Sequence, residues 1–244
     1  MKTPGIRHLA LALAASSLFA SGAVADDKVV VELFTSQGCS SCPPADALMG
    51  EFSVRDDIIV LSLPVDYWDF LGWKDTLADP AYSERQRSYA RYRGDSEVYT
   101  PQAVIGGIEH AVGSRRDDIE QKIAAARGAL AEHQVDIAIV QNGDTITITI
   151  DGEPSAKAAD ATVWLVLYRA AIEVRIGRGE NIGRTVTYYN VVREMTPIGM
   201  WHGTTASFEL PRSELMRGGS DGCAVLVQAR DTGPILAAAR LASW

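Results

Sequence analysis

Cysteine is scarce in this sequence, with three residues in a chain of 244. Small secreted domains that replace a hydrophobic core with disulfides carry many more. A disulfide framework is therefore excluded, and the length allows one large or two ordinary cores. Cys223 alternates with apolar residues in GCAVLVQA, which predicts a small buried core residue.

Basic residues are also fewer than acidic ones. The chain has 23 lysines and arginines and 31 aspartates and glutamates, which gives a net charge of −8. Nucleic-acid affinity rests on Lys and Arg neutralising phosphates. We expect no nucleic-acid partner.

Long hydrophobic runs are absent apart from Leu9–Ala20, which follows Lys2 and Arg7 and precedes the small residues AVA. This pattern predicts a signal peptide, residues 1–25, cut after Ala25. The run is shorter than the about 20 residues of a membrane span. We expect a periplasmic or secreted protein without stable membrane insertion, and an uncleaved anchor is the alternative.

Hydrophobic periodicity divides the rest of the chain near residue 134. Before it, apolar β-branched runs alternate with helical patterns, and the stretch between Pro80 and Gly94 begins and ends as helices do. The expected strands are 29–34, 58–65, 98–105 and 108–112, and the expected helices are 45–52, 80–93 and one capped by Ser114. This β-α-β-α-β-β-α order predicts an α/β domain over residues 26–133.

The second half, residues 134–244, is almost entirely strand-like. Asn142-Gly143 is a hairpin turn signal, and isoleucines alternate with threonines after it. The expected strands lie around 146–150 and at 162–168, 186–192, 205–210 and 223–229. Their spacing predicts a mainly β, sandwich-like domain.

The stretch ELFTSQGCSSCPPADALM places Cys39 and Cys42 two residues apart after a predicted strand. At a strand-to-helix turn the first cysteine is favoured as a thiolate and attacks, and the second resolves the mixed disulfide. Pro43 and Pro44 support a helix start, since proline fits the first turn. This favours a redox pair.

Two other interpretations of the cysteine pair stay open. An inert disulfide would close a very short loop and so stabilise little. Two thiolates suit Cu(I), but a zinc site needs four ligands. The histidines after the signal are His110, His133 and His202, none with ligand spacing to the pair, and they are predicted to be surface residues.

Val29–Met49 resembles the first strand, active-site turn and first helix of a thioredoxin-like domain. The segment EVYTPQAVIGG strengthens the resemblance, because such proteins place a cis-proline opposite the cysteines and before a hairpin. The resemblance implies that Pro101 shapes the substrate edge. It also implies that Thr100 offers its backbone groups to an extended substrate peptide.

The chain after the signal also resembles a family of exported bacterial proteins catalogued as a domain of unknown function. ELFTSQGCSSCPPAD and GRGEN, at 32–46 and 177–181, carry this resemblance. It implies a thioredoxin-like N-terminal domain, 26–133, followed by a β-rich domain, 134–244, and it names no reaction.

Glu32 departs from the thioredoxin-like pattern, in which an acid six positions before the first cysteine helps proton transfer. Leu33 occupies that position, and Glu32 lies one residue earlier. Either Glu32 relays the proton, or it is merely a half-buried strand acid.

Two further segments allow two interpretations each. DYWDFLGWKD, residues 66–75, forms an aromatic lip for substrates or pins this connection to the core. RIGRGENIGRT, residues 175–185, reaches the active site or an anion, or is a solvated hairpin. For both segments the structural interpretation is favoured, namely a connection pinned to the core and a solvated hairpin.

The predicted function is an exported thiol-disulfide oxidoreductase that acts on protein or peptide thiols and disulfides and needs no organic cofactor. The site residues are Cys39, Cys42, Pro101, Thr100 and Glu32. The alternatives are a periplasmic copper-binding or metallochaperone module, and a non-catalytic adaptor built on a thioredoxin-like scaffold.

Overall fold

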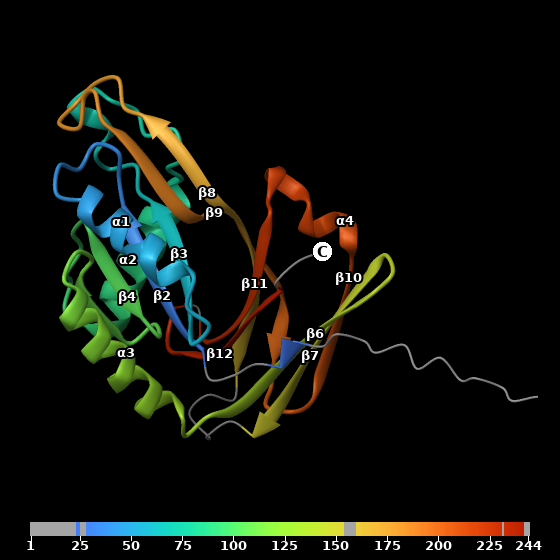
Figure 1. Ribbon diagram of the computed structural model, residues 1–244. Coiled ribbons are helices and arrows are strands. Elements are labelled where there is room, and N and C mark those ends of the chain that lie inside the picture. Colours follow the sequence, from blue (N-terminus) through green and yellow to red (C-terminus); the bar gives the residue numbers. More distant parts are fainter. Residues whose placement is uncertain (1–22, 25–27, 154–159, 231, 242–244) are drawn as a thin grey trace, which may run out of the picture.

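The computed structural model describes residues 23–24, 28–153, 160–230 and 232–241 (Figure 1). The fold is mixed α/β, with one large sheet and few helices. The predicted signal segment lies outside the described residues, except for β1 (Ala23–Val24). In the described part of the chain, no helix is long and apolar enough to cross a membrane.

The first half alternates strands and helices, as the hydrophobic pattern predicts. Its elements are β2 (Val29–Thr35), α1 (Pro43–Ser53), β3 (Ile58–Pro64), η1 (Asp69–Leu71), α2 (Pro80–Arg93), β4 (Gln102–Ile105), β5 (Glu109–Val112) and α3 (Arg116–Leu130). The side chain of Asp79 caps α2 by accepting a bond from the Ala81 amide, and Gly94 ends this helix with a φ of +76°. The predicted bounds of α2 are confirmed.

Two local predictions in the first half are wrong. The strand expected from Val98 begins only at Gln102, because Pro101 has no N–H to donate to a neighbouring strand. Ser114 does not cap α3, since Arg115 occupies the N-cap position and no side chain bonds there.

The second half is rich in strands, as predicted. Its elements are β6 (Gln134–Asn142), β7 (Thr145–Glu153), β8 (Ala161–Arg175), β9 (Thr185–Trp201), β10 (Ala206–Pro211), α4 (Arg212–Leu215), η2 (Arg217–Gly219), β11 (Gly222–Ala229) and β12 (Ile235–Leu241). β6 and β12 were not predicted, and β8 and β9 are longer than expected because they pair along a hairpin that extends to Arg175 and Thr185.

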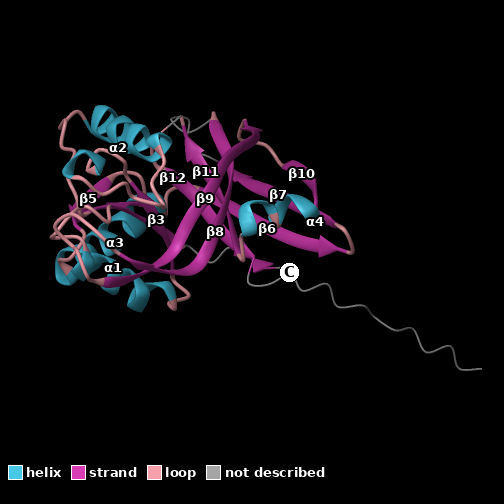
Figure 2. Ribbon diagram, turned by 90° about the horizontal axis from the view of Figure 1, so that it is seen from above, coloured by secondary structure: helices cyan, strands magenta, loops and turns pink. Residues whose placement is uncertain are grey.

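The strands form two sheets. Four strands pair in the order β1-β6-β7-β10, and eight pair in the order β12-β11-β8-β9-β3-β2-β4-β5. β9 joins β3 where Val191 lies opposite Ser62. Strands from both sides of residue 134 therefore share one sheet (Figure 2), and the division into two domains stays a prediction.

Alternate residues of β2 face different layers. Val31 and Leu33 pack with α1 and α3, whereas Val30 and Phe34 pack on the side of α2. The β8-β11-β12 part of the large sheet packs against β6 and β7. This arrangement leaves the turn after β2 at the end of the large sheet that the β8–β9 hairpin also reaches (Figure 1).

Candidate functional site around the cysteine pair

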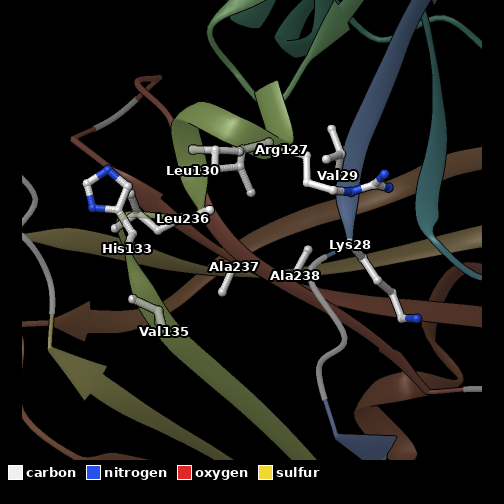
Figure 3. A pocket seen from close by; sticks show the side chains of 11 residues that line it. Lys28, Val29, Arg127, Leu130, His133, Val135, Leu236, Ala237 and Ala238 are labelled. Carbon is white, nitrogen blue, oxygen red and sulfur yellow. The ribbon is translucent and has the colours of Figure 1, made fainter. Parts of the chain in front are cut away.

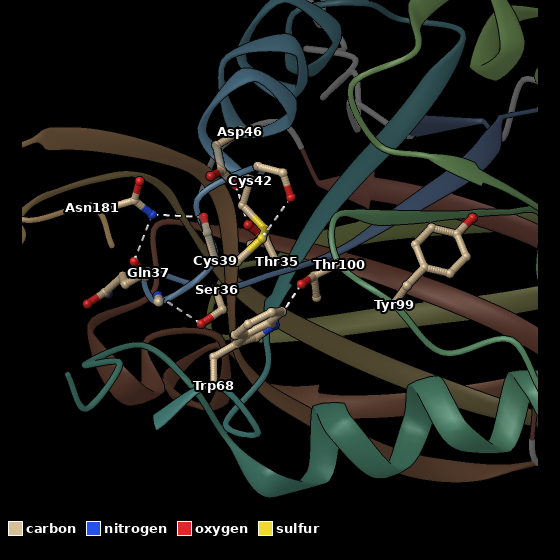
Figure 4. The surroundings of a disulfide bond; sticks show 12 residues. Thr35, Ser36, Gln37, Cys39, Cys42, Asp46, Trp68, Tyr99, Thr100 and Asn181 are labelled. Carbon is tan, nitrogen blue, oxygen red and sulfur yellow. Dashed lines mark hydrogen bonds between the residues drawn. A yellow bond between two sulfur atoms is a disulfide. The ribbon is translucent and has the colours of Figure 1, made fainter. Parts of the chain in front are cut away.

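Cys39 and Cys42 form a disulfide in the turn between β2 and α1, with their Cα atoms 5.4 Å apart (Figure 4). Both residues are buried, with exposures of 1% and 0%. Cys223 is a buried free cysteine of β11, as its alternation with apolar residues predicts. Burial raises the pKa of its thiol to about 12, so it is poorly reactive.

The start of α1 offers few free amide donors to a thiolate. Cys42 is the N-cap, and its amide already donates to the carbonyl of Cys39 over 3.2 Å. The two prolines that follow have no N–H. The hydroxyl of Ser41 lies 3.4 Å from the sulfur of Cys39, so this side chain supplies a donor where the helix does not.

Asp46 is a buried acid beside the pair that sequence reasoning missed. Its amide bonds to the carbonyl of Cys42 over 3.1 Å, which places both side chains on one face of α1. Its Oδ1 accepts a 2.7 Å bond from the Thr35 hydroxyl, and its Oδ2 has no partner among the described residues. Burial raises the pKa of Asp46 to about 8, so the folded protein holds a protonated carboxyl near Cys42 at neutral pH.

Pro101 and the start of α1 both lie next to Gly113, and the Thr100–Pro101 peptide bond is cis. The amide of Gly113 donates to the Pro101 carbonyl over 2.9 Å. A Cβ at Gly113 would lie 3.1 Å from Pro101 Cβ, 3.2 Å from Ala45 Cβ and 2.6 Å from Leu33 Cδ1. Thr100 accepts a 2.7 Å bond from the indole N–H of Trp68. The structure thus brings these two predicted residues to the cysteine turn.

Glu32 lies on the other face of β2, since its neighbours Val31 and Leu33 pack toward α1. Its carboxylate accepts bonds of 2.7 and 3.2 Å from Arg85 and a further one from the Tyr89 hydroxyl. The side chain is fully buried rather than half-buried. None of these bonds leads to the cysteines, and a role for Glu32 in proton transfer stays a prediction.

Most of the aromatic segment 66–75 packs against the rest of the protein, which is the interpretation that the sequence favoured. Tyr67 and Trp68 pack against the core on the α2 side. Trp73 donates a 2.7 Å bond to Gln37 Oε1, and the Gln37 amide donates a 2.7 Å bond to Asp75. Phe70 is the exception, because 79% of it is exposed.

Asn181, in the GRGEN segment, is the second residue that sequence reasoning missed. It is buried, and its amide nitrogen donates to the carbonyls of Gln37 and Cys39 over 3.0 and 2.8 Å (Figure 4). The solvated-hairpin interpretation is therefore wrong at Asn181. The side chains of the three arginines, at 175, 178 and 184, are exposed.

A family model described as "Protein of unknown function (DUF1223)" matches residues 30–228, a range that contains the cysteine turn and Asn181. The chain belongs to this family. It is also similar to the crystal structure of protein AGR_C_4864 from Agrobacterium tumefaciens, with 33% identity and a TM-score of 0.76. The match covers 87% of this chain and 93% of that chain. No curated protein matches this DUF1223 chain.

The histidines of this DUF1223 protein lie in different environments. His202 is exposed, as predicted. His110 is half-buried against the hydroxyl of Tyr99, at 2.9 Å, and His133 is half-buried with Nδ1 lacking a partner in the described structure. Within the described ranges, no three His, Cys, Asp or Glu residues cluster as metal ligands would.

A small pocket lies where α3 ends, beside β12 and the start of β2 (Figure 3). His133, Leu130 and Val29 are among the residues that line it, and none of the predicted site residues does. Its volume of about 30 Å³ is room for about one water molecule. A larger cavity, of about 460 Å³, is lined by Tyr82, Arg85 and Trp164 among others, and it holds none of the predicted site residues either.

Proposed function

We propose that this protein is an exported thiol-disulfide oxidoreductase in which Cys39 and Cys42 exchange electrons with protein or peptide thiols. The observation that carries the proposal is the disulfide at a strand-to-helix turn, with Pro101 and the same helix start both next to Gly113. The order from β2 to α3, with β2 and β3 parallel and β4 and β5 a hairpin, supports a thioredoxin-like arrangement.

The reaction has two exchange steps. A substrate thiolate attacks the sulfur of Cys39, the Cys39–Cys42 bond breaks, and Cys42 leaves as a thiolate that takes up a proton. A second substrate thiolate then attacks the substrate sulfur of the mixed disulfide and releases Cys39. Two substrate thiols become one disulfide, and the protein gains the two electrons. The reverse sequence reduces a substrate disulfide.

Proton transfer to Cys42 is the role we assign to Asp46. A carboxyl with a pKa of about 8 has a proton to give near neutral pH and can take it back, since an effective acid-base group titrates near the working pH. Glu32 remains the second candidate. Its carboxylate is bound to Arg85 over 2.7 Å, on the face of β2 that points away from α1.

Thr100 and Pro101 form the substrate edge in this proposal. An extended peptide would pair with the backbone of Thr100, as an added strand does. Because the disulfide residues are nearly inaccessible, the segments over the turn must move before a thiolate reaches Cys39. Export, proposed from residues 1–25, would deliver the protein to a compartment where such exchange is useful.

Mixed-disulfide trapping tests the proposal. Cys42→Ser leaves Cys39 able to attack but removes the thiol that releases the partner. We expect covalent adducts with exported proteins that dithiothreitol dissolves, and none with Cys39→Ser. Absence of adducts in the native compartment, together with stoichiometric Cu(I) bound by the reduced wild-type protein, would favour the copper-binding alternative. A normal phenotype for the double serine variant would favour the adaptor.

A further inference from the structure

Residues 175–184, which we call the arginine loop, comprise the last residue of β8 and the connection from it to β9. Arg175, Arg178 and Arg184 are exposed there, and none of the ion pairs among the described residues involves them. Elsewhere on the same hairpin, two charged residues are paired. Arg169 pairs with Asp221 over 3.1 Å, and Glu194 pairs with an arginine of η2 over 3.1 Å. The loop is thus a concentration of unpaired positive charge in a chain with a net charge of −8.

The arginine loop is fixed to the cysteine turn. Asn181 bonds to the carbonyls of Gln37 and Cys39. The loop also packs on Trp73, because a Cβ at Gly177 would lie 3.0 Å from the ring carbon Cζ3 of this tryptophan. A polypeptide that reaches Cys39 therefore passes close to the loop.

Two large apolar side chains are exposed on the two segments that are held to the cysteine turn. Ile182 follows Asn181 in the arginine loop and is 65% exposed, and Phe70 belongs to the segment pinned beside Gln37. Exposed apolar side chains next to unpaired charge are typical of sites that recognise another chain. Glu180 is the acidic residue of the loop and offsets part of its positive charge.

We propose that the arginine loop is a docking surface for an acidic polypeptide segment that carries an apolar side chain close to its reactive cysteine. Arg178 and Arg184 attract the acidic residues, and Phe70 and Ile182 contact the apolar one. Charge complementarity of this kind raises association rates and selects partners more than it raises affinity. This inference rests on the proposed function and names its substrate class.

Binding is tested in the protein with Cys39→Ser and Cys42→Ser, so that no exchange takes place. Two fluorescein-labelled peptides share a central Leu-Ser pair, and one carries glutamates where the other carries lysines. We expect the acidic peptide to bind more tightly at low salt, and Arg178→Ala with Arg184→Ala to weaken it about five- to tenfold, given two exposed charge pairs. The matched control, Arg87→Ala with Arg91→Ala, removes the same charge from α2 and should have no such effect.

The preference should also vanish near 1 M salt, where charges are screened within about 3 Å. Equal binding of both peptides, or unchanged binding in the arginine-loop variant, would overturn the inference. Reduction of a small uncharged disulfide, 2-hydroxyethyl disulfide, by the reduced cysteine-intact protein separates the two proposals. It should proceed at the same rate in the arginine-loop variant. Its absence in the wild type would count against the proposed function, whereas the peptide measurement tests the docking surface by itself.

Discussion

The side-chain amide of Asn181 donates a 2.8 Å hydrogen bond to the carbonyl oxygen of Cys39, a residue 142 positions earlier in the chain. A second bond from the same nitrogen reaches the carbonyl of Gln37. The cysteine turn is therefore held by the β8–β9 hairpin as well as by its own strand and helix. In the proposed reaction we expect these bonds to slow the opening of the turn to a substrate.

Asn181→Ala should loosen the turn. The change removes the donor to the buried carbonyl of Gln37 and leaves the carbonyl of Cys39 with the Cys42 amide alone. An unsatisfied buried group costs about 1–3 kcal/mol. We expect a lower free energy of unfolding in urea and faster reduction of the disulfide by dithiothreitol at matched folded fraction. Asn142→Ala, at an exposed turn, should change neither quantity. Loss of stability with an unchanged reduction rate would show that Asn181 does not control access.

Asp46→Asn should change the pH dependence of stability. The folded protein keeps Asp46 protonated up to a pKa of about 8, whereas the unfolded chain releases the proton near pH 4. Between these values the native state binds more protons, so stability falls as pH rises, by up to about 1.4 kcal/mol per pH unit. Unfolding midpoints of the variant measured from pH 4 to 8 should lack this fall. A wild-type slope in the variant would contradict the protonation state assigned to Asp46.

The same substitution should also slow thiol exchange. Asparagine keeps the shape of the side chain but cannot carry a proton between Cys42 and solvent, and loss of a general acid or base costs about 10²- to 10⁴-fold at the step it serves. Stopped-flow exchange with a model dithiol, followed against pH, measures the effect. An unaltered pH-rate profile would leave Glu32 as the candidate.

Glu32→Gln should chiefly destabilise the fold. The substitution leaves the buried guanidinium of Arg85 without its carboxylate, and breaking a buried ion pair costs about 3–5 kcal/mol. If Asp46 carries the proton, the exchange rate per folded molecule should stay near that of the wild type. A tenfold slower rate in a still folded Glu32→Gln protein would assign the relay to Glu32 instead.

Gly113→Ala should disturb the packing of Pro101 and of the start of α1 around residue 113. The added methyl would meet Leu33 Cδ1 at 2.6 Å, and such overpacking typically costs about 1–3 kcal/mol. We expect a lower melting temperature and slower exchange with peptide substrates. Gly128→Ala is the control, because nothing lies within 4 Å of its Cβ position in α3 and helix propensity favours alanine. Wild-type kinetics in Gly113→Ala would argue against a role for Pro101 at the substrate edge.

Local signals in the sequence were enough to predict many elements. Pro80 and Gly94 define α2, and apolar β-branched runs define β2 and β3. The missing information is long-range. No pattern around Val191 indicates that β9 pairs with β3, so the shared sheet was not foreseen.

The candidate site shows the same limit. The CxxC turn and Thr100-Pro101 are short motifs, and both were found in the sequence. Asp46 looks like an ordinary acid in the first turn of a helix until packing buries it. Asn181 stands among exposed residues of a glycine-rich loop, and only the tertiary fold directs its amide into the cysteine turn. The GRGEN segment was the one sequence signal in the region of Asn181.

The reduction potential of the Cys39–Cys42 disulfide tests the central claim most directly. Equilibration of the purified protein with glutathione buffers and lower-potential dithiol buffers, with the thiol state read by alkylation and mass shift, gives this value. An exchanging pair should lie above about −300 mV, in the range of known oxidoreductases. A potential below about −300 mV, typical of structural disulfides, would contradict the proposed function.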